Sequence, residues 1–243
     1  MSFERILKTI SNFVATVVVF FLLGGVYLSS KGFVWQEDGK IVLVANAIAQ
    51  DDVSKIDTPE IPDNMVLPLR HVEGDENAKI TIYEYSSLGC SHCADFHLNV
   101  IPELIKYYAD KGGLRVAYVP FPLDKQSMDA ALLAECMPKD KYFEFVNVLY
   151  KKQRDWRLSR NPEKVLKKYA ALNGLDKEKM DECLHNDNNA REILDDRQTG
   201  ITQLGIKGTP SFIISYAGRN EVIYGVRSVK EIEELITKQV NEY

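Results

Sequence analysis

Two cysteines separated by two residues lie between a segment that favours a strand and one that favours a helix. The apolar segment Ile80–Leu88 comes first, and Cys90-Ser91-His92-Cys93 follows almost directly. The first turn of a helix carries free N–H groups and the positive end of the helix dipole, and both stabilise a thiolate relative to a thiol. The sequence therefore predicts a reactive Cys90 at a strand-to-helix junction, with Cys93 partly buried one turn further on.

Other roles for this dithiol fit the sequence less well. A structural disulfide with this spacing at a helix start is strained and readily reduced. A zinc site that also used His92 and His97 would need a second ligand pair at matching spacing, and the nearby sequence holds none. Covalent haem attachment needs a histidine directly after the second cysteine, where Ala94 stands. The pattern favours redox chemistry of the dithiol itself, without a metal or other cofactor.

Two polar side chains near the dithiol are candidates for charge and proton effects. His92 lies between the cysteines and can add positive charge or a hydrogen bond to the Cys90 thiolate. Glu84 lies on the preceding strand, on the face opposite to its two tyrosine neighbours. A carboxyl buried there would have a raised pKa and could relay protons to the Cys93 thiol. The alternative is a solvent-facing Glu84 on an edge strand.

A proline begins a later predicted strand, where Gly208-Thr209-Pro210 precedes residues 211–216. Proline fits into a sheet only at an edge, at a bulge or at the first residue of a strand. A cis Thr209–Pro210 bond would leave the Thr209 backbone free to pair with an extended substrate beside Cys90. An ordinary trans proline at the start of the strand is the alternative.

The N-terminal residues indicate export from the cytosol. Arg5 and Lys8 precede an apolar run from Phe13 to Leu28, which is typical of a signal peptide or a membrane anchor. Small residues between positions 45 and 49 also resemble a signal-peptidase site, so cleavage and retention both stay open. We expect residues 1–28 to be a signal peptide or an inner-membrane anchor, and the rest of the chain to lie in the periplasm.

The two remaining cysteines, Cys136 and Cys183, lie in a helical region of the sequence. In an oxidising compartment they are expected to form a structural disulfide. Two buried free thiols are the alternative.

The chain divides into an N-terminal segment, a tether and a globular part. Residues 29–65 are polar and contain two prolines, which is typical of a tether. From residue 66 the periodicity predicts a mixed sheet covered by helices, an α/β fold with a helical insertion at about 124–190. The expected strands are 66–72, 79–86, 114–119, 211–216 and 221–224, and the expected helices are 90–110, 127–137, 141–152, 162–172, 177–184, 188–204 and 230–241.

The charge pattern does not favour a nucleic-acid partner. The net charge is −5, and the one basic stretch, residues 151–168, also contains acidic side chains in a helical pattern. A solvated helix face is the better interpretation of that stretch.

These features together resemble the DsbA-like thiol oxidoreductases of the thioredoxin superfamily. The resemblance covers residues 66–243 and is carried by Tyr83-Glu84-Tyr85-Ser86-Ser87-Leu88-Gly89-Cys90-Ser91-His92-Cys93, by Gly208-Thr209-Pro210 and by the helical insertion. It implies a thioredoxin fold in which Cys90 is the exchanging sulfur, Cys93 the resolving one, Glu84 the buried carboxyl and Pro210 a cis-proline. It also implies unfolded exported proteins as substrates and a DsbB-like membrane protein as reoxidant.

Two positions depart from the best-known oxidase of that family. Ser91 and His92 stand where it has Pro-His, and Thr209 stands where it has valine. A disulfide isomerase or reductase is therefore the first alternative to an oxidase. A metal-binding or peptide-holding chaperone is the second. The family's isomerases carry an N-terminal dimerisation domain, and residues 29–65 are too short and polar for one, which favours a monomer.

Overall fold

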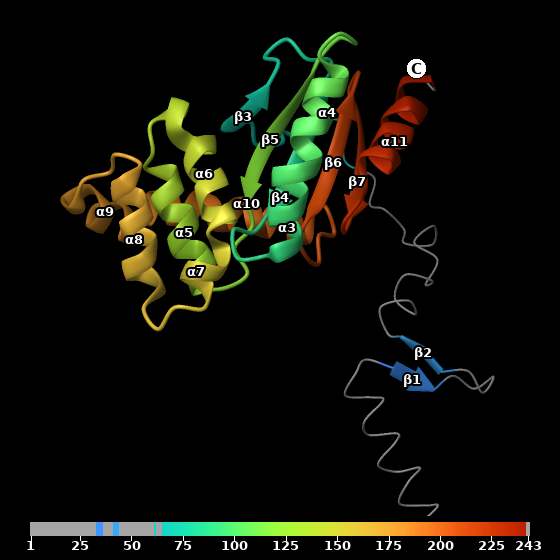
Figure 1. Cartoon of the computed structure of the whole chain (residues 1–243). Helices are drawn as coiled ribbons and strands as arrows, with labels where there is room; N and C mark the ends of the chain where they lie inside the picture. Colours follow the sequence, from blue (N-terminus) through green and yellow to red (C-terminus); the bar gives the residue numbers. More distant parts are fainter. Residues whose placement is uncertain (1–32, 36–40, 44–60, 62–64, 242–243) are drawn as a thin grey trace, which may run out of the picture. The chain divides into compact units, whose positions relative to one another are not determined.

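The computed structural model describes residues 33–35, 41–43, 61 and 65–241, and the chain forms two compact units, residues 1–57 and 58–243 (Figure 1). In the first unit, β1 (Phe33–Trp35) pairs antiparallel with β2 (Ile41–Leu43). The segment expected to be a plain tether thus contains a strand pair, formed by two β-prone triplets.

The expected signal peptide or anchor, residues 1–28, lies outside the described residues. Among the helices that the structure describes, none is both long and apolar enough to cross a membrane.

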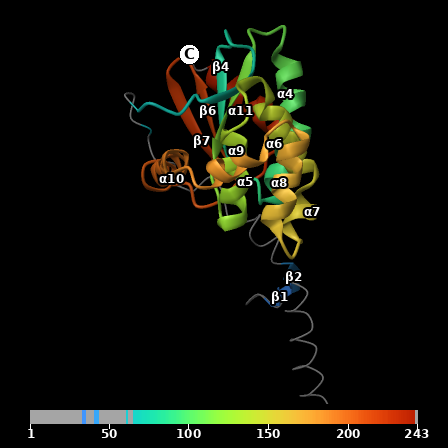
Figure 2. The ribbon, with the colours of Figure 1, turned by 90° about the vertical axis from the view of Figure 1, so that its left-hand side faces the viewer.

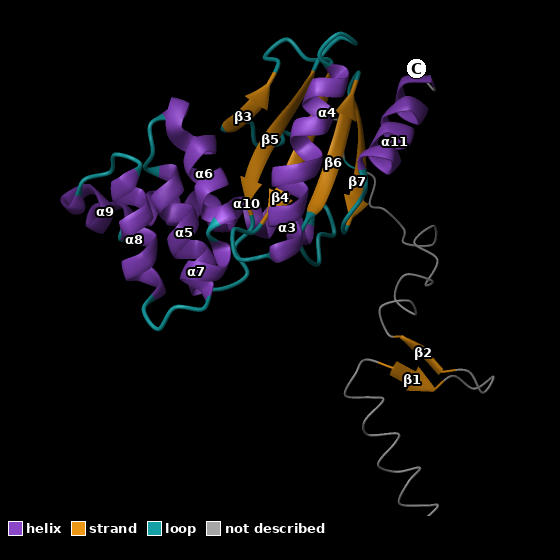
Figure 3. Ribbon diagram, in the orientation of Figure 1, coloured by secondary structure: helices purple, strands orange, loops and turns teal. Residues whose placement is uncertain are grey.

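The second unit is built on a five-stranded mixed sheet with the strand order β3-β5-β4-β6-β7 (Figure 3). Strands β4 and β5 run parallel, and every other neighbouring pair is antiparallel. The central strand β4 is buried along its whole length, because helices cover both faces of the sheet. The strands are β3 (His71–Gly74), β4 (Ile80–Ser86), β5 (Leu114–Pro120), β6 (Ser211–Tyr216) and β7 (Arg219–Tyr224).

Two strands begin at least two residues away from the start that the sequence predicts. The edge strand β3 begins at His71 rather than at residue 66, beyond Pro68, which has no N–H for a ladder. Strand β7 begins at Arg219 rather than at residue 221. The reason is a tight turn in which Ala217 and Gly218 both have positive φ, as a two-residue hairpin turn of the primed type requires.

The helix after β4 is divided into three consecutive segments. These are α3 (Ser91–Asp95), a π-helical segment η2 (Phe96–Val100) and α4 (Ile101–Tyr108). Pro102 lies in the first turn of α4. A proline inside a regular helix clashes with the carbonyl four residues earlier, and the wider π-helical turn before it relieves that clash.

Two apolar cores lie on opposite faces of the sheet. Helices α4 and α11 (Val229–Asn241) cover one face. Helix α10 (Asp187–Thr202) and the residues after it cover the other, and Figure 2 shows α4 and α10 on opposite sides of the strands. The first core includes Ile82, Leu104, Phe212 and Ile232, and the second includes Tyr85, Val119, Leu204 and Ile213.

A bundle of helices is inserted between β5 and α10 and has a core of its own. It consists of α5 (Lys125–Glu135), a 3₁₀ turn η3 (Lys139–Lys141), α6 (Tyr142–Lys151), α7 (Gln153–Arg157), α8 (Pro162–Leu172) and α9 (Lys177–Leu184). The side chains of Asp124, Asn161 and Asp176 cap α5, α8 and α9. The short helix α7 was not predicted from the sequence.

A disulfide joins Cys136, at the end of α5, to Cys183 in α9. It closes a loop over 47 positions of sequence and links the first helix of the insertion to the last.

Removing this disulfide is expected to lower the free energy of unfolding by about 4 kcal/mol, because the unfolded chain regains the entropy of that loop. Urea unfolding of Cys136→Ala/Cys183→Ala and of wild type, both with the other two cysteines oxidised, measures the difference. Equal unfolding midpoints would show that the bond adds no stability.

Candidate active site

The dithiol begins α3 at the end of the central strand. Cys90 is the N-cap residue, with an extended backbone (φ −93°, ψ 124°), so the first free N–H groups of the helix lie next to its side chain. Gly89 packs against the insertion: a Cβ at this position would lie 3.2 Å from Cβ of Ser127 and 3.4 Å from the Arg157 guanidinium. The turn before Cys90 therefore has no room for a larger residue without a shift.

Cys90 is the more accessible cysteine, and its pKa is lowered to about 5. The largest cause is a hydrogen bond from the Cys93 thiol, which stabilises the Cys90 thiolate. Partial burial acts in the opposite direction, and the backbone N–H groups of His92 and Cys93 favour the thiolate further. His92 contributes through its backbone N–H, while its side chain is exposed, so the charge effect expected of its imidazole is not among these causes.

Cys93 has the opposite environment. Its side chain is fully buried against the helical insertion, and burial is the main reason that its pKa is raised far above the ordinary thiol value. The neighbouring Cys90 adds to this rise. The Ser87 N–H donates a hydrogen bond of 3.5 Å to Cys93 Sγ. At neutral pH the pair is therefore one thiolate and one thiol.

Glu84 is completely buried on the central strand, so its alternative placement on an exposed edge is wrong. Its Oε2 atom lies 2.8 Å from Nδ1 of His97, which is also buried. Burial opposes the charged imidazolium, but the Glu84 carboxylate, with a smaller contribution from Glu73, outweighs it, and the pKa of His97 is raised.

The sequence marked His97 only as a conceivable metal ligand, although it follows Cys93 by one helical turn. Within the described part of the chain, no three or more His, Cys, Asp or Glu side chains are placed to hold a metal ion.

The loop before β6 faces the dithiol. The Thr209–Pro210 peptide bond is cis, and β6 pairs with the central strand directly after it. Cys90 Sγ lies 3.5 Å from the Thr209 carbonyl oxygen and donates a hydrogen bond to it when Cys90 is protonated. The structure thus brings Thr209 and Pro210 next to Cys90 from a distant part of the sequence.

Gln153 in α7 is a site residue that the sequence did not reveal. Its Nε2 atom donates hydrogen bonds to the carbonyl oxygens of Leu88 (2.7 Å) and Cys90 (2.9 Å). These bonds hold the backbone on both sides of the active-site turn and so keep the helix N-terminus aligned with the Cys90 sulfur. No local sequence pattern predicts such a contact between an insertion helix and a distant turn.

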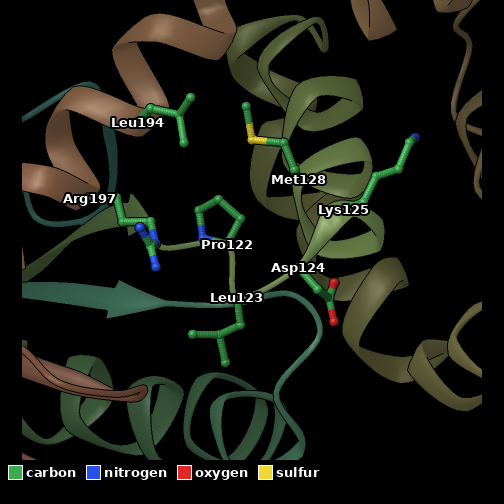
Figure 4. A pocket seen from close by; sticks show the side chains of 7 residues that line it. All are labelled: Pro122, Leu123, Asp124, Lys125, Met128, Leu194 and Arg197. Atoms are coloured by element: carbon green, nitrogen blue, oxygen red, sulfur yellow. The ribbon is translucent and has the colours of Figure 1, made fainter.

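A pocket of about 220 Å³ lies between the start of α5 and α10. Figure 4 shows Leu194 and Met128 facing one another across it beside Pro122. It contains neither cysteine and is separate from the dithiol. Its lining residues are Pro122, Leu123, Asp124, Lys125, Met128, Leu194 and Arg197.

A mixed sheet with a dithiol at a helix start and a cis-proline loop facing it is the arrangement of thioredoxin-fold proteins. The family model described as Thioredoxin matches residues 68–238 of the chain. The chain therefore belongs to the thioredoxin family, and the expected fold, with its helical insertion, is confirmed.

Known relatives place the chain near the DsbA-like members. A Rickettsia felis protein, provisionally named a protein-disulfide oxidoreductase, is 30% identical over 174 residues, which cover 70% of this chain and 60% of that protein. The chain thus spans less than two thirds of that relative. Disulfide bond formation protein D of Bacillus subtilis is 25% identical over 175 residues, covering 70% of this chain and 76% of that protein.

Solved structures agree with this placement. The crystal structure of α-DsbA1 from Wolbachia pipientis superimposes with a TM-score of 0.65 at 29% identity, covering 72% of this chain and 94% of that chain. The oxidised form of BdbD from Bacillus subtilis has the same fold, with a TM-score of 0.62 at 23% identity over 76% of this chain and 97% of that chain. The resemblance to DsbA-like proteins that the sequence indicated is confirmed.

The Cys90 thiol of the reduced protein is expected to titrate with a pKa of about 5, well below the value of about 8.5 for free cysteine. Ultraviolet absorbance of the thiolate as a function of pH measures it, and Cys90→Ser should abolish the transition. Because the folded-state pKa is the lower one, the thiolate stabilises the reduced fold fully above about pH 8.5 and loses this effect as the pH falls through about 5. An ordinary thiol titration would contradict the geometry described here.

Replacing Gln153 by methionine is expected to raise the pKa of Cys90 and to lower the free energy of unfolding by about 1–3 kcal/mol, since two carbonyl groups lose a donor. Titration and urea unfolding measure the two effects. Gln203→Met is the matched control, because Gln203 is exposed at the end of α10. If both variants titrate like wild type, Gln153 does not position the turn.

Proposed function

We propose that the chain is a protein-thiol oxidase that introduces disulfide bonds into exported proteins in the periplasm. The observation that carries this proposal is the asymmetry of the dithiol: Cys90 is accessible with a lowered pKa, and Cys93 is buried with a raised one. A stable Cys90 thiolate favours the reduced form, so the disulfide form is a good electron acceptor. The names of the relatives support the same chemistry.

The reaction begins with the Cys90–Cys93 disulfide. A client thiolate attacks Sγ of Cys90, a bond forms between client and Cys90, and Cys93 leaves with the electron pair of the broken bond. A second client thiolate then attacks the client sulfur of the mixed disulfide, and Cys90 leaves as a thiolate. The client loses two electrons, the enzyme gains two, and the low pKa of Cys90 makes it a good leaving group.

The loop that faces the dithiol is the proposed client-binding element. The carbonyl oxygen of Thr209 lies 3.5 Å from Cys90 Sγ in the free protein, so this backbone group lies where a bound client would reach. We propose that an extended client segment pairs with the Thr209 backbone beside Pro210, as a strand added to the sheet would. Glu84 is the proposed buried acid–base group for Cys93.

The remaining parts of the proposal concern the cell. No cofactor is needed, because the electrons stay on sulfur. A DsbB-like membrane protein would reoxidise the dithiol, the N-terminal segment would be the export signal or inner-membrane anchor, and the protein would act as a monomer. Unfolded exported proteins would be its clients.

A disulfide isomerase or reductase is the second candidate, and Thr209 before Pro210 is the observation that favours it. The two roles differ in the redox state that the protein prefers. An oxidase must pass its disulfide on to a client easily, so its reduced form must be the more stable one.

Equilibration with a glutathione redox buffer tests the choice. With a Cys90 pKa of about 5, the reduced form at pH 7 should be favoured about a hundredfold over that of a dithiol with ordinary pKa values. Alkylation and mass measurement give the reduced fraction. A dithiol that glutathione reduces only under strongly reducing conditions would remove the oxidase role.

The resolving role of Cys93 has its own control in the same assay. Cys93→Ala should stop at a mixed disulfide between Cys90 and glutathione, whereas Cys90→Ser should form none. A Cys93→Ala protein that stays free of glutathione would show that Cys90 is not the exchanging sulfur.

A further inference from the structure

Three buried hydroxyl groups are hydrogen-bonded to one another in a row beside Cys93. Ser86, the last residue of β4, directly precedes Ser87, whose N–H donates a hydrogen bond to Cys93 Sγ, and the Ser86 hydroxyl favours the Cys93 thiolate. Ser86 Oγ lies 2.9 Å from Oη of Tyr150 on α6, and Tyr150 Oη lies 2.8 Å from Oη of Tyr118 on β5. All four side chains are at most 3% exposed, so water does not reach them from the surface.

The far end of this chain lies beside the Glu84–His97 pair. Tyr118 is the register partner of Glu84 on the neighbouring parallel strand, so the two side chains project from the same face of the sheet. The His97 ring centre is 5.5 Å from that of Tyr118 and 5.2 Å from that of Tyr150. Glu84 Oε1 is buried and has no hydrogen-bond partner, Tyr118 Oη included, so one acceptor of the pair is unoccupied.

We propose that Ser86, Tyr150 and Tyr118 form a proton relay between the Cys93 thiol and the Glu84–His97 pair. The inference rests on the proposed function and goes beyond it by naming the route that protons take. Ser86 is the member of the proposed relay nearest the reacting sulfur in the chain order, and the two tyrosines extend the row toward the pair.

The relay supplies the proton that the exchange reaction needs at a buried atom. When the Cys90–Cys93 bond breaks, Cys93 holds the electron pair as a thiolate. Ser86 donates its proton to that thiolate and receives one from Tyr150, which receives one from Tyr118. Tyr118 takes its proton from the Glu84–His97 pair. When Cys93 attacks Cys90 during reoxidation, the same proton returns along the chain to the pair.

The chemistry of the chain suits proton transfer without ionised intermediates. Cys93 cannot stay a thiolate in its apolar surroundings, and burial raises the pKa of Tyr118 and Tyr150 well above the ordinary value. Each hydroxyl therefore gives up one proton only as it receives another. The titratable groups around this path are Cys90, Glu84 and His97, together with Glu73 on the edge strand, which interacts electrostatically with Glu84 and His97 and is partly exposed.

Single-turnover exchange with glutathione tests the relay in both directions, using the full-length protein. Ser86→Ala and Tyr150→Phe each remove one hydroxyl from the chain. We expect each to slow both reduction by glutathione and reoxidation by glutathione disulfide about tenfold or more, the effect of losing general acid–base assistance. The solvent deuterium isotope effect should change, while the pKa of Cys90, whose own hydrogen bonds remain, should not.

Two further variants separate proton relay from packing. Tyr85→Phe removes a buried hydroxyl without a hydrogen-bond partner on the opposite face of the sheet and should exchange like wild type. Ser86→Thr keeps the hydroxyl and should restore most of the rate that Ser86→Ala loses. Wild-type rates and isotope effects in Ser86→Ala and Tyr150→Phe would overturn the relay, and so would an equal loss in Tyr85→Phe. Failure of wild type to exchange with glutathione would instead overturn the proposed function.

Discussion

Stabilisation of one thiolate at the start of α3 is the interaction on which the rest of the site depends. Cys90 receives a hydrogen bond from the Cys93 thiol and lies against the first N–H groups of the helix. Both donors exist only because the chain turns sharply from β4 into α3. The contacts of Gly89 and Gln153 with this turn are therefore as much a part of the chemistry as the sulfur atoms.

The helical insertion completes the active site as well as forming a subdomain. It buries Cys93, supplies Gln153 to the turn and contributes Tyr150 to the buried hydroxyl chain. Burial raises the pKa of Cys93, while the hydrogen bond from Cys93 and the N–H groups of the helix start lower the pKa of Cys90. The two pKa values therefore differ for different physical reasons. The disulfide between Cys136 and Cys183 links the ends of the subdomain that creates this difference.

Much of the fold could be predicted because its signals are local. Alternation in the segment that became β4, the C-x-x-C spacing and the helical periodicity of α8 and α9 each depend on a few neighbouring residues. Local signals failed where neighbours in space decide the outcome. The π-helical segment before Pro102 and the short helix α7 are examples, since both depend on packing that no short window contains.

Residue types and spacing alone established a dithiol at a strand-to-helix junction, a mixed α/β class and the resemblance to DsbA-like proteins. They left the environment of Glu84 open. Alternation along a strand assigns a side chain to one face of the sheet, but it does not say which residues pack against that face. Tertiary structure placed β4 in the centre of the sheet, put His97 against Glu84 and brought Thr209 to Cys90. Burial and the pKa shifts that follow from it arise between distant segments, so only the folded chain decides them.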